Sequence, residues 1–112
     1  MTLERIDEEA VVITRIWRGW TRSTDADRYD QHYRAEVLST LRQVAGFRGA
    51  RLLRRSLGEQ TEFVSLTFFD DLDALRGFAG PDYETAVVAE EARRVLIRFD
   101  ERVGHYETAF EA

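Results

Sequence analysis

Cysteine is absent from this 112-residue sequence, which excludes disulfide bonds and thiolate metal sites. Histidine occurs only twice, at His32 and His105, far apart in the chain, so a histidine-rich metal site is not expected. No apolar run is long enough to cross a bilayer. The net charge of -5 argues against a nucleic-acid partner, because binding phosphates requires clustered positive charge.

Five of the first ten residues, 1–10, are charged, and four of these five are acidic. They predict a peripheral N-terminal arm. Their charge is opposite to that of a secretory signal, so a cytoplasmic protein is expected. Residues 11–112 have the length of one globular domain, and the apolar content of the whole chain, 44%, is ordinary for such a domain.

The first half of the domain predicts one strand and one helix. Residues Val11 to Gly19 are rich in β-branched and aromatic side chains, which is typical of a strand. A helix follows, with Ser23 or Thr24 as its N-cap and Gly46 as its C-terminal stop. Its apolar stripe recurs at steps of three and four residues and comprises Ala26, Tyr29, Tyr33, Val37, Leu41 and Val44.

The second half predicts a hairpin, a short helix and a last strand. The hairpin turns near Gly58 and Glu59, and its first arm carries Arg48, Arg51, Arg54 and Arg55, which suits an edge strand. Its second arm contains the apolar strand Phe63–Phe69. Asp70 or Asp71 caps a short helix whose inner side carries Leu72, Leu75, Phe78 and Ala79. Residues 95–99 are ambiguous between helix and extended chain, and 103–110 predict the last strand.

The resulting order, β-α-β-β-α-β, is the split βαβ or ferredoxin-like pattern of an α+β protein. Right-handed connections place both helices on one face of an antiparallel sheet, with the first and third strands in the middle. These two strands are apolar on both faces, so the face without helices remains uncovered. We therefore expect a homodimer that pairs the open sheet faces.

Several stretches resemble the antibiotic biosynthesis monooxygenase family. They are "ITRIWRGWT", "DADRYDQHY", "VAGFRGARLLRR", "EFVSLTFFDDLDALRGFAG" and "VGHYETAF", which together span about residues 11–110. The resemblance implies a dimeric α+β barrel with a ligand cavity between the helices and the sheet of each subunit. It also implies cofactor-independent oxygenation of an aromatic or quinol-like small molecule.

Three departures from the family pattern narrow this expectation. Many members have tryptophan where this chain has Phe69. Haem-degrading members use an asparagine on the first strand and a histidine on the second helix. This sequence contains no asparagine, and residues 72–80 contain no histidine, which argues against haem degradation by that route.

Two residues are candidate catalytic groups. His32, beside the tyrosines of the first helix, is a candidate base if it faces the cavity, and otherwise a half-exposed structural histidine. Arg15 shares a strand face with Ile13 and Trp17, and a buried arginine needs a partner. It either binds an anionic ligand or pairs with Glu62 or another carboxylate across the sheet or the dimer.

Aromatic residues are the candidate substrate contacts. They are Trp17, Tyr29, Tyr33, Phe69 and Phe78, with the two phenylalanines expected opposite the two tyrosines. Trp17 and Trp20 form either a stacking wall for a flat ligand or part of the packing. His105 and Tyr106 point to opposite faces of the last strand, so one of them faces the helices.

Two functions remain open at this point. One is a cofactor-independent monooxygenase that acts on an aromatic or quinol-like molecule. The other is a non-catalytic dimer of the same fold that binds a small ligand or regulates another process, because no complete catalytic constellation stands out.

Overall fold

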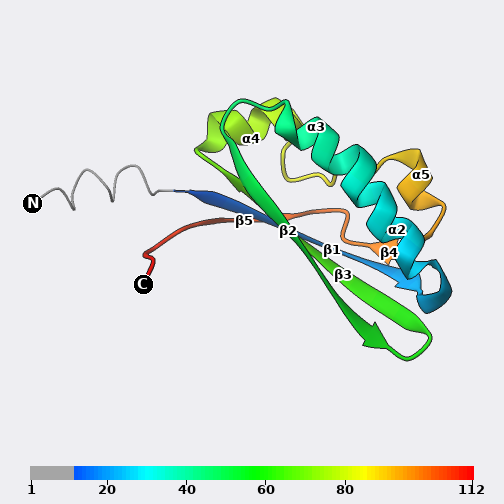
Figure 1. The fold of residues 1–112 in the computed structure, drawn as a ribbon. Coiled ribbons are helices and arrows are strands. Elements are labelled where there is room, and N and C mark those ends of the chain that lie inside the picture. Colours follow the sequence, from blue (N-terminus) through cyan, green and yellow to red (C-terminus); the bar gives the residue numbers. More distant parts are fainter. Residues whose placement is uncertain (1–11) are drawn as a thin grey trace, which may run out of the picture.

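The structure, a computed structural model, describes residues 12–112. Its strands are β1 (Ile13–Arg22), β2 (Phe47–Leu57), β3 (Gln60–Phe69), β4 (Leu96–Phe99) and β5 (Gly104–Glu107). Its helical segments are η1 (Ser23–Asp25), α2 (Ala26–His32), η2 (Tyr33–Val37), α3 (Leu38–Arg42), α4 (Leu72–Ala79) and α5 (Glu90–Arg93). The helices lie over one face of the sheet (Figure 1). The arm predicted at 1–10 lies outside the described residues.

The sheet is antiparallel and confirms the predicted ferredoxin-like topology. Its strand order is β2-β3-β1-β4, and β5 also pairs with β1. β1 and β3 are therefore central, as the two-sided apolar pattern predicts, and the arginine-rich β2 lies at an edge. The charged side chains of β2 suit this place because they discourage pairing with a further strand.

The edge of β1 opposite β3 is occupied by two short strands rather than by one. β4 pairs with Gly19–Thr21, and β5 pairs with Ile13–Ile16. Residues 96–99, ambiguous from the sequence, are therefore extended. The predicted last strand is shortened to four residues, because β4 already occupies the other end of the same edge.

The first helical stretch is continuous from Ser23 to Arg42, but neither of its ends follows the prediction. The Ser23 hydroxyl donates to the Gly58 carbonyl over 2.9 Å and lies 3.1 Å from the Thr61 hydroxyl, so it ties the helix start to the hairpin rather than capping it. The helix ends at Arg42. Gly46, with a φ of 87°, instead turns the chain into β2.

The short helix α4 agrees closely with its sequence signals. The Asp71 carboxylate accepts from the Ala74 backbone N–H over 2.9 Å, which satisfies a free donor of the first turn. Gly80 ends the helix with a φ of 83°. Leu75 is fully buried as expected, whereas Leu72 is 38% exposed and does not belong to the inner side.

The core lies between the helices and the facing side chains of β1 and β3. One cluster centres on Phe63, whose ring centroid is 4.8 Å from that of Tyr29. The second cluster surrounds Phe69 and includes Leu41 and Leu75, all three without solvent exposure. The alternation of the strands and the helical stripe thus produce one continuous apolar layer.

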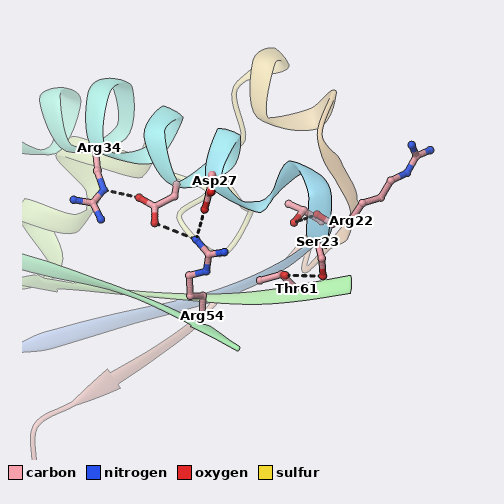
Figure 2. Close-up of polar contacts among 8 residues, drawn as sticks. Arg22, Ser23, Asp27, Arg34, Arg54 and Thr61 are labelled. Atoms are coloured by element: carbon pink, nitrogen blue, oxygen red, sulfur yellow. Dashed lines mark hydrogen bonds and ion pairs between the residues drawn. The ribbon is translucent and has the colours of Figure 1, made fainter. Parts of the chain in front are cut away.

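Polar contacts fasten the start of the first helix to the sheet. Arg54 of β2 donates to Asp27 over 3.0 Å and also reaches Asp30, which in turn accepts from Arg34 (Figure 2). The guanidinium of Arg54 lies 5.4 Å from the Phe63 ring centroid. Bonding with Arg34 and Arg54 lowers the pKa of the Asp30 carboxyl below its ordinary value, although burial opposes this shift.

The opposite face of the sheet carries an apolar centre, flanked by Arg18, Arg51 and Arg55, and has no helix over it in the part of the chain described. Its central side chains, which are Ile16, Val64, Leu66 and Phe68, are only half-buried. Leu53, Leu57 and Tyr106 are about half exposed, at 48%, 47% and 59%. This face therefore retains the two-sided apolar character that the sequence indicates for the central strands.

Candidate functional site

A cavity lies between the helical layer and the sheet. Its volume is about 60 Å³. Its walls come from β1, β3, the first helical stretch, α4 and the segment 87–92. The lining residues are Arg15, Trp17, Tyr29, His32, Tyr33, Val37, Leu41, Ser65, Thr67, Phe78, Val87, Val88, Ala89 and Ala92. The site is thus mainly apolar and aromatic, with a few polar groups from facing elements.

The structure brings six of the seven candidate residues to this cavity. They are Arg15, Trp17, Tyr29, His32, Tyr33 and Phe78. Phe69 does not line the cavity, so the expectation that both phenylalanines lie opposite the two tyrosines is wrong for Phe69. Its ring lies behind Phe78, at a centroid distance of 6.1 Å, and is fully buried in the second core cluster. The functional roles of the residues remain predictions.

Arg15 is 4% exposed, and no carboxylate within residues 12–112 forms an ion pair with it. Its Nη1 donates to the Tyr83 carbonyl over 2.5 Å and lies 2.9 Å from His105 Nε2, while its Nη2 donates to the Thr85 carbonyl over 3.2 Å. Burial lowers the pKa of Arg15 to about 10, so it remains a cation at neutral pH. A buried cation held by neutral acceptors favours an anionic ligand.

Within one chain, Arg15 does not pair with Glu62. Glu62 lies on the open face of β3, where its carboxylate accepts from Arg55 over 2.5 Å. Arg15 lies on the helix-facing side of β1, among the residues that line the cavity. The two side chains point to opposite faces because their positions on the paired strands differ in alternation.

His32 also contributes a polar atom without a partner. Its Nε2 is shielded from solvent and makes no hydrogen bond to any residue from 12 to 112. Such buried polar atoms are uncommon because they lose their bonds to water without replacement. The residue lies at the end of α2, immediately before the π-helical turn η2. Turns of this type are frequent at functional sites.

Tyr29 and Tyr33 provide hydroxyl groups in the same wall. Tyr33 shares a 2.7 Å hydrogen bond with the Ser65 hydroxyl. Burial, aided by the neighbouring Tyr33, raises the pKa of Tyr29 above its ordinary value. Burial also raises the pKa of Tyr33, opposed by the bond to Ser65. Both phenols therefore remain protonated and are able to donate to a ligand.

The two tryptophans have different roles. The Trp17 indole N–H donates to the Asp100 carbonyl over 3.0 Å, and its ring lines the cavity. Trp20 lies on the opposite face of the sheet, with the Arg98 guanidinium 3.8 Å from its ring centroid. The stacking-wall interpretation therefore applies only to Trp17, while Trp20 packs beneath a cation.

His105 is a residue of the site whose place sequence reasoning left open. It faces the helices, next to Arg15 across the β1–β5 pair, while Tyr106 points to the open face. The Tyr83 ring packs edge-on against it at 5.2 Å. Burial and the charge of Arg15 lower the pKa of His105, opposed by Glu84. His105 is thus a neutral acceptor that orients the guanidinium of Arg15.

Acidification should destabilise the protein through His105. The pKa of His105 in the folded protein lies below the ordinary 6.5 of the unfolded chain, so protons bind the unfolded chain first. The contribution of His105 to the free energy of unfolding is therefore complete above pH 6.5 and is lost as pH falls through the folded pKa. We expect a His105→Gln variant, which keeps an acceptor, to lose less stability than wild type below pH 6.5. Urea unfolding across pH measures this difference.

The His32→Gln variant is the matched control for this pH dependence. It retains His105 and should therefore preserve the wild-type loss of stability on acidification. Parallel pH profiles for wild type and His105→Gln would contradict the assignment.

Sequence analysis missed the cavity wall formed by residues 83–92. Here the Tyr83 and Thr85 carbonyls hold Arg15, and the side chains of Val87, Val88 and Ala89 line the cavity. Backbone carbonyls have no residue-specific signature, so the sequence offered no signal for them. In residues 12–112 no group of three or more His, Cys, Asp or Glu side chains is arranged to hold a metal ion.

The fold defines a class of small α+β proteins with a cavity between the helices and the sheet, and comparison with known proteins identifies the family. The chain belongs to the antibiotic biosynthesis monooxygenase family, whose model matches residues 11–90. No curated protein sequence matches it. None of the helices described between residues 12 and 112 has the length and apolar character needed to cross a membrane.

Solved structures show the same fold at low sequence identity. SnoaB, a cofactor-independent oxygenase from Streptomyces nogalater, is 20% identical, with a TM-score of 0.65 over 92% of this chain and 97% of its own. A conserved protein from Methanosarcina mazei is 10% identical, with a TM-score of 0.64 over 90% and 96%. Rv0793 from Mycobacterium tuberculosis is 20% identical, with a TM-score of 0.55 over 90% and 96%.

Proposed function

We propose that this protein is a cofactor-independent monooxygenase that acts on an aromatic or quinol-like small molecule in the cavity. One observation carries the proposal: the unpartnered His32 Nε2 and the Arg15 cation, which lacks a carboxylate partner, line one aromatic cavity. Family membership and the oxygenase activity of SnoaB support the choice of reaction. In this proposal His32 is a base, and Tyr29, Tyr33 and Arg15 stabilise the resulting anion.

The chemistry requires only the substrate and dioxygen. His32 removes the hydroxyl proton of a phenol, and the phenolate transfers an electron to O₂. Recombination forms a carbon–oxygen bond, and His32 returns its proton to the peroxide. Loss of the ring C–H proton and cleavage of the O–O bond then produce a quinone and water. The substrate loses four electrons, and O₂ gains four.

The size of the cavity sets a condition on this function. A cavity of about 150 Å³ accepts benzene, whereas the present 60 Å³ is sufficient for a few water molecules. We expect the wall at residues 87–89 to move when a ring enters. This wall has neither helix nor strand structure, and the side chain of Val87 is already 56% exposed.

Oxygen consumption tests this proposal directly. The protein should accelerate oxygen uptake with at least one member of a panel of hydroquinones and polyphenols, above the rate of spontaneous oxidation. One oxygen should be consumed per quinone formed. Saturable binding of panel members without uptake would instead support the alternative, a non-catalytic ligand-binding or regulatory dimer, for which the small volume of the cavity is the favouring observation.

We also propose that the protein forms a homodimer through its open sheet faces. The supporting observation is the half-buried apolar set Ile16, Val64, Leu66 and Phe68, which no described element covers. A contiguous apolar face of roughly several hundred Å² is unusual on a monomer. A two-fold axis would pair this face with the same face of a second copy.

The cytoplasmic location also stays a proposal.

A charge placed in this face should separate the dimer. Light scattering at micromolar concentration should give twice the 13.0 kDa mass of one chain for wild type. Leu66→Asp should give the mass of one chain, because an unpaired carboxylate would be desolvated in the interface. Leu72→Asp, the same change at a 38% exposed leucine of α4, should remain dimeric. A wild-type mass of one chain would refute the proposal.

A further inference from the structure

The polar groups of the cavity lie on opposite walls. Arg15 belongs to β1, on the sheet side, where its contacts are Tyr83, Thr85, His105 and the Phe78 ring, 5.7 Å from its guanidinium. His32 belongs to α2, on the helix side, and its ring packs near Tyr29. No described residue forms a hydrogen bond with both. Aromatic and aliphatic side chains occupy the space between these walls.

Arg15 has N–H groups that are available to donate hydrogen bonds to a ligand. A guanidinium carries five N–H groups, and the three contacts to Tyr83, His105 and Thr85 leave two without a protein acceptor within residues 12–112. The positive charge is present before any substrate is deprotonated. The group that matches it is therefore a permanent anion, and a carboxylate matches the planar fork of an arginine.

We propose that the ligand of this cavity is a hydroxylated aromatic carboxylic acid. Its carboxylate binds Arg15, its ring lies between the aromatic walls, and its hydroxyl group meets His32 Nε2. His105 is a positioning residue, since it contacts Arg15 and holds the guanidinium toward this end of the cavity. This inference rests on the proposed function, because it concerns the same site and names the class of its substrate.

Binding of matched small molecules tests the inference without activity. The probes are 4-hydroxybenzoate, its neutral analogue 4-hydroxybenzamide, and benzoate, which lacks the hydroxyl group. Quenching of Trp17 fluorescence and calorimetry report binding. We expect wild type to bind 4-hydroxybenzoate about 10- to 100-fold more tightly than the amide, as a charge-assisted hydrogen bond provides.

Two variants assign each end of the ligand. Arg15→Met should remove the preference for acid over amide and keep the preference for the hydroxyl group. His32→Ala should do the reverse. Because Arg15 also holds residues 83–85, circular dichroism and melting must first show that its variant is folded. The comparison of acid with amide on wild type needs no variant and decides the inference if that variant fails to fold.

Equal affinity of wild type for the acid and the amide would overturn the inference, and so would the lack of saturable binding of 4-hydroxybenzoate. Its failure is distinguishable from failure of the proposed function. Preferential binding of the acid without oxygen uptake would refute the proposed oxygenase activity and support the proposed binding of an aromatic acid. Oxygen uptake with neutral hydroquinones and no preference for acids would support the oxygenase activity and refute the binding of an aromatic acid.

Discussion

Replacement of His32 by alanine is expected to lower the rate of substrate-dependent oxygen uptake about 100-fold, at the low end for loss of a general base. The reason is that Nε2 is the only buried side-chain nitrogen or oxygen in residues 12–112 without a hydrogen-bond partner, and it lines the cavity. The variant should stay folded, because His32 is only half-buried and forms no bond through this atom. Oxygen-electrode kinetics measure the loss.

A neighbouring residue provides the control for this prediction. Gln31 is exposed on the same helix, and Gln31→Ala should retain the wild-type rate. Added imidazole should restore part of the activity of His32→Ala, because it replaces the missing base in the space left by the side chain. A variant rate equal to that of wild type would remove His32 from the mechanism.

Replacement of Phe63 by alanine is expected to lower the free energy of unfolding by about 3–5 kcal/mol. Phe63 is fully buried in the core cluster beneath Tyr29, 4.8 Å between ring centroids, and its removal leaves a cavity that the rigid sheet cannot fill. Urea unfolding at constant m-value measures the change.

Phe110→Ala is the matched control for this loss of stability. Its side chain is 82% exposed near the end of the chain, so the same substitution should cost less than about 0.5 kcal/mol. Equal losses for the two variants would show that the assignment of Phe63 to the helix-facing side is wrong.

The candidate site was predictable wherever a residue's direction follows from its own element. The alternation of β1 places Arg15 and Trp17 on one face, and the stripe of the first helix places Tyr29 and Tyr33 against them. Phe69 shares the face of its strand with other cavity residues but lies one step too far along it, where Leu41 and Leu75 enclose it. Alternation predicts the face of a residue, but the side chains packed over that face, here Phe78, decide whether the residue reaches the cavity.

The sequence by itself determined the family, the ferredoxin-like topology, the central place of β1 and β3, and the edge position of the arginine-rich strand, because these follow from local periodicity and the order of elements. Only the tertiary structure decided what Arg15 contacts. Tyr83, Thr85 and His105 are 68 to 90 residues away in the chain, and two of the three offer backbone carbonyls. Such contacts depend on strand register and on the path of an irregular segment, and neither leaves a repeating pattern in the sequence.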